Sequence, residues 1–441
     1  MADDSSESGI NRRRFLALTG AGVVASASGP LLYSAPAAAF DTNARIVIVG
    51  AGAAGLSLAS RLSRALNGAR ITIIDARERH IYQPGLTLVA TGIWQADKVL
   101  DRNERYIPEG VRWLRDSVVA YEPDHNRVRT AAGDTVEYDY LLVATGLQVN
   151  YADVEGMSAE LIGEHGVACV YDSPEYASAS ARVIDSFVER GGRGLFTRAR
   201  GAIKCAGAPL KVALLTENSL KLAGTRDNAE LHYLPPGDGL FSQPDINRFL
   251  KTHMPDDRGF QMDWHHPLVA IEPEKRQATF DAPGGQKTLD YDMIHVVPPM
   301  SAPDALRNSP LAAAEGGFQG WLEVDLHSMR HTRYPNVFGA GDVVGTPIGK
   351  TAASVKAQVP VVVENLLAVL RDQPLTARYN GYTSCPLITE RGRAILVEFD
   401  YQLKMVPSFP FISPYREHWV PWLMKDRMLQ AAYNAMLRGR V

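Results

Sequence analysis

Short apolar runs alternate with segments of helical periodicity along the first third of the chain. Residues 44–49 and 70–74 are short and almost wholly apolar, which predicts β-strands buried on both faces. Between them, leucine and alanine recur at helical spacing over residues 56–66. Two further short strands are predicted at 138–143 and 334–339. Strands that alternate with helices in this way indicate an α/β fold with parallel sheets.

A glycine-rich turn joins the first predicted strand to the first predicted helix. Gly50, Gly52 and Gly55 form the pattern G-x-G-x-x-G in the strand–turn–helix context that a dinucleotide site requires. The first glycine permits the tight turn, the second lets the backbone approach a pyrophosphate, and the third lets helix and strand pack closely. Asp75 ends the next strand, where an acidic side chain binds a ribose hydroxyl. These residues leave open whether the dinucleotide is NAD or FAD.

Two later segments decide between these cofactors. Thr145-Gly146 and Gly341-Asp342 each follow a predicted strand. Together with the first glycine turn, these segments resemble the flavoproteins with two dinucleotide-binding domains that are related to the disulfide reductases. The resemblance spans residues 43–365 and keeps the order of the three motifs. It implies two Rossmann-like domains, FAD as the cofactor, and Asp342 as the residue that binds its ribityl chain.

The second dinucleotide domain lacks the motif that a second nucleotide would need. Residues 191–205 stand where members that use NADH carry another G-x-G-x-x-G, and only a short strand is predicted there, at 195–197. Arg198 and Arg200 follow it, where close approach of the backbone to a phosphate would need glycine. We therefore expect a degenerate domain without a nucleotide site, and an unusual NADH site stays open as the alternative. The expected domains are an FAD-type domain at 43–150 and 321–365, and a NAD-like domain at 151–320.

Three cysteines occur in the chain, and two of them lie in distinctive segments. Cys205 stands in Lys-Cys-Ala-Gly-Ala-Pro at the start of a predicted helix and beside lysine, a setting that favours the thiolate. Cys385 stands in Thr-Ser-Cys-Pro-Leu before a predicted strand at 393–399. With the segments at 80–89 and 349–353, these motifs resemble those of the sulfide:quinone oxidoreductases. This resemblance covers almost the whole chain after its first 39 residues.

The resemblance implies a sulfide-oxidising enzyme whose site is built around two thiols. Cys205 and Cys385 would form a disulfide, or a sulfur-bridged form of it, beside the flavin. Hydrosulfide would attack one sulfur and leave a persulfide and a thiolate. Electrons would then pass to FAD and on to a quinone, while the persulfide sulfur leaves to an acceptor. Lys350, next to Thr351 in the matched segment, would stabilise the reduced flavin, although a solvated loop lysine would show the same pattern.

Three neighbouring residues remain open between a catalytic and a structural role. Cys169 lies in an apolar run and is either a buried structural thiol or the third cysteine that some sulfide:quinone oxidoreductases place at the flavin. Glu164 and His165 are candidate bases for hydrosulfide, but exposed loop residues would give the same pattern.

The C-terminal segment, residues 366–441, is expected to face the quinone and the membrane. Residues 419–437 predict an amphipathic helix, which suits a membrane surface and equally suits ordinary packing. One face of this helix would carry Trp422, Met428, Leu429, Tyr433, Met436 and Leu437, with Lys425 and Arg427 around it. The aromatic side chains expected to line a quinone pocket, or else to join the core, are Phe399, Tyr401, Phe409 and Phe411.

The first 39 residues resemble an export signal. Residues 12–16 (Arg-Arg-Arg-Phe-Leu) precede a mildly apolar stretch and a run of small residues at 35–39, as in a twin-arginine signal peptide. We therefore expect a periplasmic protein that is peripheral to the membrane. A net charge of −3 gives no basic surface for nucleic acid, and the three cysteines lack zinc-site spacing, so no metal is expected. The oligomeric state is left open.

Three other functions compete with this hypothesis. The flavoprotein subunit of a flavocytochrome c sulfide dehydrogenase would pass electrons to a c-type haem partner. That family carries a flavin-linking cysteine where this chain has residues 82–85 (Tyr-Gln-Pro-Gly), which argues against it. A type II NADH dehydrogenase is disfavoured by the missing second glycine turn and by the cysteine pair. A non-catalytic flavoprotein is opposed only by the intact thiol motifs.

Overall fold

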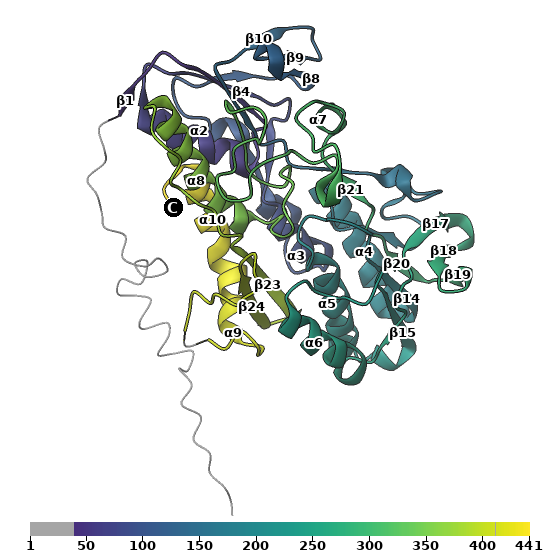
Figure 1. Cartoon of the computed structure of the whole chain (residues 1–441). Helices are drawn as coiled ribbons and strands as arrows, with labels where there is room; N and C mark the ends of the chain where they lie inside the picture. The colour runs from purple at the N-terminus through teal and green to yellow at the C-terminus, as the bar shows by residue number, and fades with distance from the viewer. Residues whose placement is uncertain (1–38, 411) are drawn as a thin grey trace, which may run out of the picture.

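Two parallel sheets form the framework of the molecule. The computed structural model describes residues 39–410 and 412–441, so the predicted export signal lies outside the described residues except for its last position. The first sheet has five parallel strands and lies in the upper part of Figure 1. Its strands, in spatial order, are β22 (Val337–Gly339), β11 (Tyr140–Val143), β2 (Arg45–Val49), β4 (Arg70–Ile74) and β7 (Arg112–Leu114).

The first domain is assembled from two separate stretches of sequence. Strand β22, from far along the chain, pairs in parallel with β11 and completes the sheet. Helix α2 (Ala53–Ala65) follows β2 after the glycine turn, and α8 (Ala352–Leu370) follows β22 and packs against α2. By length and composition alone α8 could cross a bilayer, but Val355, Val359 and Val362 along it are buried in the core.

A second five-stranded parallel sheet forms the other domain. Its central strand begins at Gly192, three residues before the predicted start, and its helices are α4 (Pro174–Arg190), α5 (Ala208–Ala223) and α6 (Pro244–Thr252). The two parallel sheets confirm the predicted fold class. The strands, in spatial order, are β13 (Val167–Ala168), β20 (Met293–His295), β14 (Gly192–Thr197), β15 (Ala229–Leu234) and β16 (Phe260–Met262).

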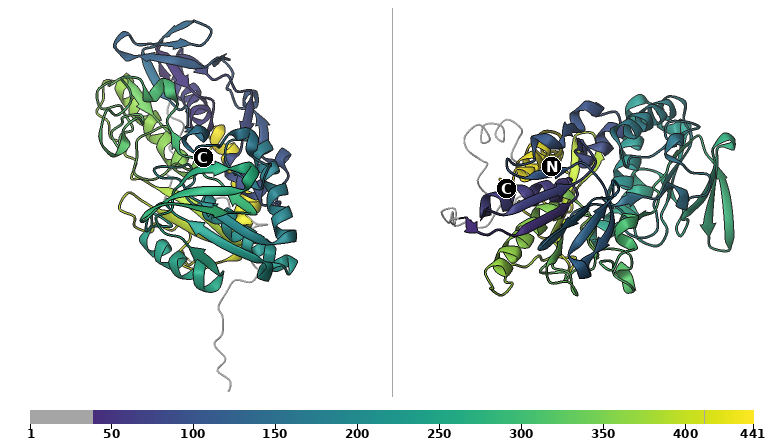
Figure 2. Two further views of the ribbon diagram at one scale, coloured as in Figure 1. Left: turned by 90° about the vertical axis from the view of Figure 1, so that its right-hand side faces the viewer. Right: turned by 90° about the horizontal axis from the view of Figure 1, so that it is seen from above.

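Smaller elements complete the two domains. Two three-stranded antiparallel sheets project outward from them (Figure 2). Their strands are β8 (Val118–Glu122), β9 (Arg127–Thr130) and β10 (Thr135–Glu137), and β17 (Leu268–Glu272), β18 (Gln277–Ala282) and β19 (Gly285–Asp290). Three short strand pairs are β1 (Phe40–Asp41) with β3 (Leu66–Asn67), β5 (Arg79–Ile81) with β6 (Leu100–Arg102), and β12 (Gln148–Val149) with β21 (Met300–Ser301). Two short helices are α3 (Leu86–Ala90) and α7 (Asp304–Arg307).

The C-terminal segment joins the two domains. A hairpin of β23 (Thr383–Glu390) and β24 (Arg393–Phe399) packs against α5 of the second domain. The chain then forms α9 (Trp419–Leu423), a π-helical turn (Met424–Met428) and α10 (Leu429–Leu437). Helix α10 packs on α2 of the first domain, so this segment, yellow in Figure 1, contacts both halves.

The π turn corrects the predicted face of the amphipathic helix. Tyr433, Met436 and Leu437 are buried, which fits the packing alternative for this face, whereas Met428 is 45% exposed and Lys425, predicted on the charged rim, is 2% exposed. A π turn holds one more residue than an α-helical turn and so rotates the register of the residues after it. The sequence pattern assumed an uninterrupted α-helix and therefore placed Met428 and Lys425 on the wrong sides.

Candidate active site

The glycine turn after β2 has the shape of a dinucleotide cradle. Gly50 has φ +105°, a left-handed conformation that favours glycine. A Cβ atom on Gly55 would lie 1.8 Å from the carbonyl oxygen of Gly50, so helix and strand can approach only because this residue is glycine. Beside Gly52 and Gly146 no atom of residues 39–410 or 412–441 lies within 4 Å of such a Cβ, their own chain neighbours aside. The turn is therefore tightly packed at its base and open at its tip, which fits a pyrophosphate.

Substitution of two glycines in this turn should separate folding from cofactor binding. In Gly55→Ala the new methyl group meets the backbone, and we expect a loss of about 1–3 kcal/mol in the free energy of unfolding. In Gly52→Ala the methyl group meets no protein atom, so stability of the cofactor-free protein should be unchanged while FAD affinity falls. Thermal melts and flavin retention on a desalting column measure both effects. Equal destabilisation of the two cofactor-free variants would contradict the assignment of the open tip to the cofactor.

Asp75 lies at the end of β4 as an ionised acceptor. It is 8% exposed and accepts hydrogen bonds from the Ala51 amide at 2.6 Å and from the Arg77 guanidinium at 2.8 Å. Burial would raise the pKa of this carboxyl group, but the hydrogen bonds from Arg77 and Ala51 outweigh it and lower the pKa. A carboxylate at this strand end suits the ribose hydroxyls of a nucleotide.

The ends of β11 and β22 bring two further polar groups to the same edge of the sheet. The Thr145 hydroxyl is buried and has no hydrogen-bond partner among the described residues. Gly341 has φ +88° and donates its amide to Gln358 Oε1 at 2.8 Å, which fixes the turn that presents Asp342. Burial raises the pKa of Asp342, and the nearby charges of Lys350 and Lys204 oppose this shift. A buried hydroxyl without a partner among the described residues, next to the Asp342 carboxyl group, fits the hydroxyl-rich ribityl chain of FAD.

Lys350 lies directly beside this edge. Its Nζ donates to the carbonyl oxygens of Asp342 and Val344, at 2.7 and 3.0 Å, and lies 3.5 Å from the centre of the Trp321 ring. Burial lowers the pKa of Lys350 to about 8, with Asp342 opposing the shift. Thr351 caps the start of α8, where its Oγ1 accepts from the Ser354 amide at 3.1 Å. The ammonium group is therefore held in one place by backbone atoms.

The structure brings Cys205 and Cys385 together. Their side chains are hydrogen-bonded to one another, Cys385 from β23 and Cys205 from the turn before α5. Cys205 has φ +49°, a left-handed conformation that costs a non-glycine residue about 1 kcal/mol or more. Its amide donates to the Lys350 carbonyl at 2.9 Å, so the turn that carries the thiol is tied to the segment that carries Lys350.

Charge around the pair makes the two sulfur atoms unequal. The hydrogen bond from Cys385 and the ammonium group of Lys211, 3.4 Å from Cys205 Sγ, hold the pKa of Cys205 well below its ordinary value. The same hydrogen bond, together with burial, raises the pKa of Cys385 well above its ordinary value. In the reduced pair Cys205 is therefore the thiolate and Cys385 is the thiol that donates to it.

Two buried lysines complete this site, and neither was a predicted site residue. Burial alone would lower the pKa of Lys211, but the adjacent sulfur atoms of Cys205 and Cys385 raise it. Burial and the charge of Lys211 lower the pKa of Lys425 to about 7. The Lys425 ammonium group donates to the Pro84 carbonyl and lies in the field of both thiols. Lys211 could have been found from its position near the start of the helix that follows Cys205, whereas Lys425 had no local signal.

Cys169 is a buried thiol apart from the hydrogen-bonded pair. It is fully buried at the end of β13, and its backbone exchanges hydrogen bonds with the Ser180 hydroxyl at 2.8 and 3.0 Å. Burial raises the pKa of its thiol to about 12. This environment favours the structural interpretation of Cys169, because a protonated thiol is a poor nucleophile.

The two candidate bases lie at the wrong edge of the second sheet. Glu164 and His165 are exposed in the loop that precedes β13. Cys205 follows the carboxyl end of β14, and in a parallel sheet the residues before one strand lie at the edge opposite to those that follow another. This position argues against either residue as the base for hydrosulfide and favours the alternative that both are exposed loop residues.

The predicted quinone-site aromatics have separate surroundings. Phe399 is buried and packs edge-on against Phe241, with ring centres 6.1 Å apart, whereas Tyr401 packs edge-on against Tyr379 at 5.4 Å. Phe409 is half-buried, and Phe411 lies outside the described residues. The quinone pocket therefore stays a prediction.

The connection after β14 differs from the glycine turn after β2. Residues 50–52 suffice to join β2 to α2, whereas residues 198–207 separate β14 from α5. Arg198 donates to the Gly239 carbonyl at 3.0 Å, and Arg200 pairs with Asp281 at 2.9 Å. The place of a phosphate turn is thus taken by a longer segment that ends in the Cys205 thiol.

The sequence and the fold match known proteins. Residues 44–179 match the family model of the pyridine nucleotide-disulphide oxidoreductases. The chain is 38% identical over 398 residues to the mitochondrial sulfide:quinone oxidoreductase of Dictyostelium discoideum, covering 90% of this chain and 86% of that protein. It is 34% identical to the corresponding mouse (Mus musculus) protein, covering 93% and 90%. The X-ray structure of the sulfide:quinone oxidoreductase from Aquifex aeolicus has a TM-score of 0.76 at 18% identity, covering 90% of this chain and 92% of that one.

These matches agree with the cofactor site. The matched family and its relatives are FAD-dependent flavoproteins, which confirms FAD as the cofactor. The glycine turn, Asp75 and the polar strand ends described above fit that cofactor. With relatives at 34–38% identity over nine-tenths of its length, the chain belongs to the sulfide:quinone oxidoreductase family.

Proposed function

We propose that this chain oxidises hydrosulfide at the Cys205–Cys385 pair and passes the electrons through FAD to a quinone. The observation that carries the proposal is the contact of two thiols, from segments far apart in sequence, beside the buried ammonium groups of Lys211 and Lys425. The relatives from Dictyostelium and mouse are named for sulfide as donor and quinone as acceptor, which supports the same pair of substrates here.

The unequal thiols suggest which sulfur is attacked. In the oxidised pair, hydrosulfide would form a new bond to the Cys385 sulfur while the bond between the two cysteine sulfurs breaks. The electron pair of that bond goes to Cys205, because the thiol with the lower pKa leaves faster. Cys385 then carries the persulfide, and Cys205 is a thiolate held by Lys211.

The two lysines act on charge rather than as nucleophiles. Lys211 neutralises the thiolate of Cys205, since its Nζ lies within hydrogen-bond distance of that sulfur. Lys425 adds a second positive charge near both sulfurs and titrates near neutral pH. In a buried site such charges attract an anion such as hydrosulfide strongly, because the surroundings screen them little.

The remaining groups hold the cofactor and release the sulfur. FAD, when bound, supplies a two-electron acceptor for the Cys205 thiolate and a donor for the quinone. Lys350 keeps a positive charge at the carboxyl edge of the first sheet, where it would favour the anionic reduced cofactor. A nucleophilic acceptor takes the outer persulfide sulfur, and the bonding pair returns to Cys385 as a thiolate. The Cys205 and Cys385 thiolates then form their disulfide again, and the two electrons that this bond formation releases are the pair that FAD would accept.

The cellular location of the protein and its access to quinone are proposed from the sequence. We propose twin-arginine export to the periplasm, and peripheral contact with the membrane through the C-terminal helices. The exposed Met428 and the half-buried Trp422 support an outward apolar surface there. The aromatic side chains of Phe399, Tyr401, Phe409 and Phe411 are proposed to guide the quinone ring.

Anaerobic mixing with sulfide tests the electron donor. We expect sulfide to bleach the flavin absorbance rapidly and a short-chain quinone to restore it, since the thiol pair supplies the electrons. NADH should bleach it poorly, because residues 198–207 offer no glycine turn for a phosphate. Stopped-flow absorbance records both reactions. Bleaching by NADH at a rate equal to that with sulfide would overturn the proposal.

A further inference from the structure

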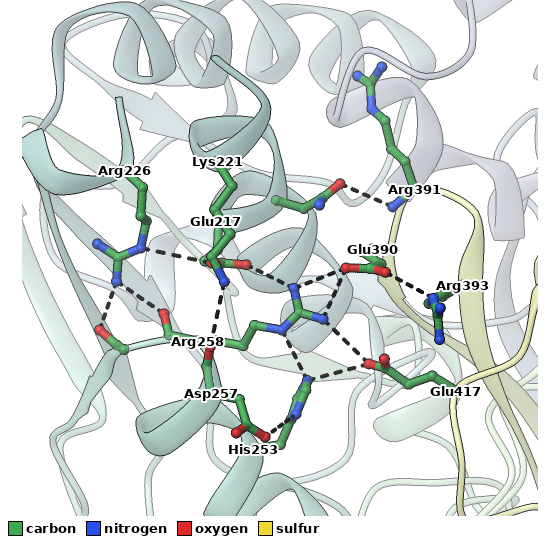
Figure 3. Close-up of polar contacts among 12 residues, drawn as sticks. Glu217, Lys221, Arg226, His253, Asp257, Arg258, Glu390, Arg391, Arg393 and Glu417 are labelled. Carbon is green, nitrogen blue, oxygen red and sulfur yellow. Dashed lines mark hydrogen bonds and ion pairs between the residues drawn. The ribbon is translucent and has the colours of Figure 1, made fainter. Parts of the chain in front are cut away.

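A buried cluster of charged side chains lies at the contact between the second domain and the C-terminal segment (Figure 3). At its centre is Arg258, which follows a π-helical turn (His253–Asp257) and is 7% exposed. Its guanidinium group reaches the carboxylates of Glu217 at 3.2 Å, Glu390 at 3.3 Å and Glu417 at 3.4 Å. One buried guanidinium group thus holds three carboxylates, of which Glu217 is buried and the other two are half-buried.

The three carboxylates come from three different segments, and each of these segments also delivers one group of the thiol site. Helix α5, which provides Glu217, carries Lys211. Strand β23, which ends at Glu390, carries Cys385. The segment that provides Glu417 leads through α9 to Lys425. Arg258 is therefore the common attachment point of the elements that meet at the two sulfurs.

The cluster is strongly paired. Glu217 is fully buried and also contacts Lys221 at 2.6 Å. Burial opposes ionisation of Glu417, but its contacts with His253, at 3.4 Å, and with the Arg258 guanidinium group lower its pKa to about 2. His253 Nε2 accepts from Arg258 Nε at 3.1 Å, so the imidazole joins the carboxylates around the same guanidinium group. A planar guanidinium group offers five donors in fixed directions, which a lysine ammonium group cannot reproduce.

Regular elements connect the cluster to the thiols. Along α5, Lys211 and Glu217 are six residues apart, or about 9 Å at the helical rise. Along β23, Cys385 and Glu390 are five residues apart, or about 17 Å. The Arg391 amide also donates to Asn218 Oδ1 at 3.1 Å, which ties the hairpin turn to the same helix. A shift of either element at Arg258 is thus transmitted to its sulfur-bearing end.

We propose that Arg258 is a positioning residue for the thiol pair. By fastening α5, β23 and the segment before α9 to one guanidinium group, it sets the separation of the Cys205 and Cys385 sulfurs and so the equilibrium between dithiol and disulfide. The inference rests on the proposed function in one respect, that this pair is the one that changes oxidation state.

The disulfide equilibrium of the FAD-loaded full chain tests the proposal. The protein is equilibrated anaerobically in dithiothreitol redox buffers and alkylated, and the Cys205–Cys385 disulfide is counted by peptide mass spectrometry. Each disulfide formed passes two electrons and two protons to oxidised dithiothreitol. In Arg258→Met we expect the equilibrium constant for disulfide formation to fall at least tenfold, a shift of about 30 mV in the reduction potential. In Arg258→Lys the equilibrium constant should lie between those of Arg258→Met and the unaltered protein.

Arg226→Met is the matched control. Arg226 lies near Glu217 at 3.9 Å and donates to the carbonyls of Ala229, Arg258 and Gly259, all within the second domain. This variant should lose thermal stability while its disulfide equilibrium stays within twofold of the unaltered protein. A purely structural role for Arg258 would give the same outcome in both variants, and that result would overturn the proposal.

Two further results keep the test decisive. If Arg258→Met does not fold, Glu390→Gln removes a single attachment and should lower the equilibrium constant at least threefold; an unchanged constant would overturn the proposal. If the unaltered protein forms no Cys205–Cys385 disulfide in any buffer, the proposed function itself fails and the inference falls with it. If the unaltered protein forms the disulfide and the Arg258 variants do so equally well, the inference alone fails.

Discussion

Serine at position 205 or 385 is expected to abolish sulfide-dependent quinone reduction, with a loss of about 1,000-fold or more in rate. A serine oxygen cannot form the disulfide that hydrosulfide attacks, so neither persulfide nor thiolate arises. FAD should stay bound, because Cys205 and Cys385 lie outside the glycine turn and the polar strand ends that fit the cofactor. Quinone reduction is followed by absorbance, and the FAD content of each purified variant is measured after release.

Cys169→Ser is the control for this pair of substitutions. Its thiol is fully buried and its pKa is raised to about 12, so we expect sulfide oxidation to change by less than tenfold. Retention of normal activity in both Cys205→Ser and Cys385→Ser would rule out the disulfide mechanism, while the assignment of the family would stand.

Lys211→Met is expected to slow flavin reduction by sulfide about 10- to 100-fold at neutral pH, since one pKa unit corresponds to a tenfold change in protonation equilibrium. Lys211 contributes to the low pKa of Cys205, so its removal raises that pKa. Below the new pKa the thiolate is protonated and the rate falls. Above it the thiolate returns, so the deficit should shrink as the pH rises. Stopped-flow rates across the pH range, with alkylation of Cys205 as an independent measure of thiolate, give the profile.

Lys251→Met, an exposed substitution in α6 of the same domain, serves as the control and should leave the profile unchanged. A Lys211→Met profile parallel to that of the unaltered protein at every pH would mean that Lys211 contributes nothing to the thiolate.

The parts of the fold that depend on neighbouring residues could be predicted from the sequence. The predicted strand at 70–74 coincides with β4, and the predicted helix after Gly55 coincides with most of α2, because apolar periodicity and glycine turns act over a few residues. The contact of Cys205 with Cys385 was expected only from the resemblance to a family. No local pattern relates these two positions.

Two departures from the sequence expectations have a common physical origin. Lys425 was placed on a charged rim because its pattern was interpreted without the π turn and without the Pro84 carbonyl that receives its ammonium group. Glu164 and His165 were candidate bases because they lie near Cys169 in sequence, and strand direction places them at the opposite edge of the sheet, which favours the alternative of exposed loop residues. Three-dimensional packing, rather than sequence distance, decided each case.

The three cysteines are synthesised in the order Cys169, Cys205, Cys385, and this order bears on which thiols can meet during folding. Cys205 leaves the ribosome 180 residues before Cys385, an interval of about 10–40 s at ordinary rates of translation. During this time Cys169 is the other thiol already made. The contact that holds Cys169, between its backbone and Ser180, involves residues that are all complete before Cys205 appears. The strand before Cys169 also pairs with β20, which is complete before Cys385 is made. The earliest thiol can therefore be buried before the third one appears, so that Cys385 meets Cys205 rather than Cys169.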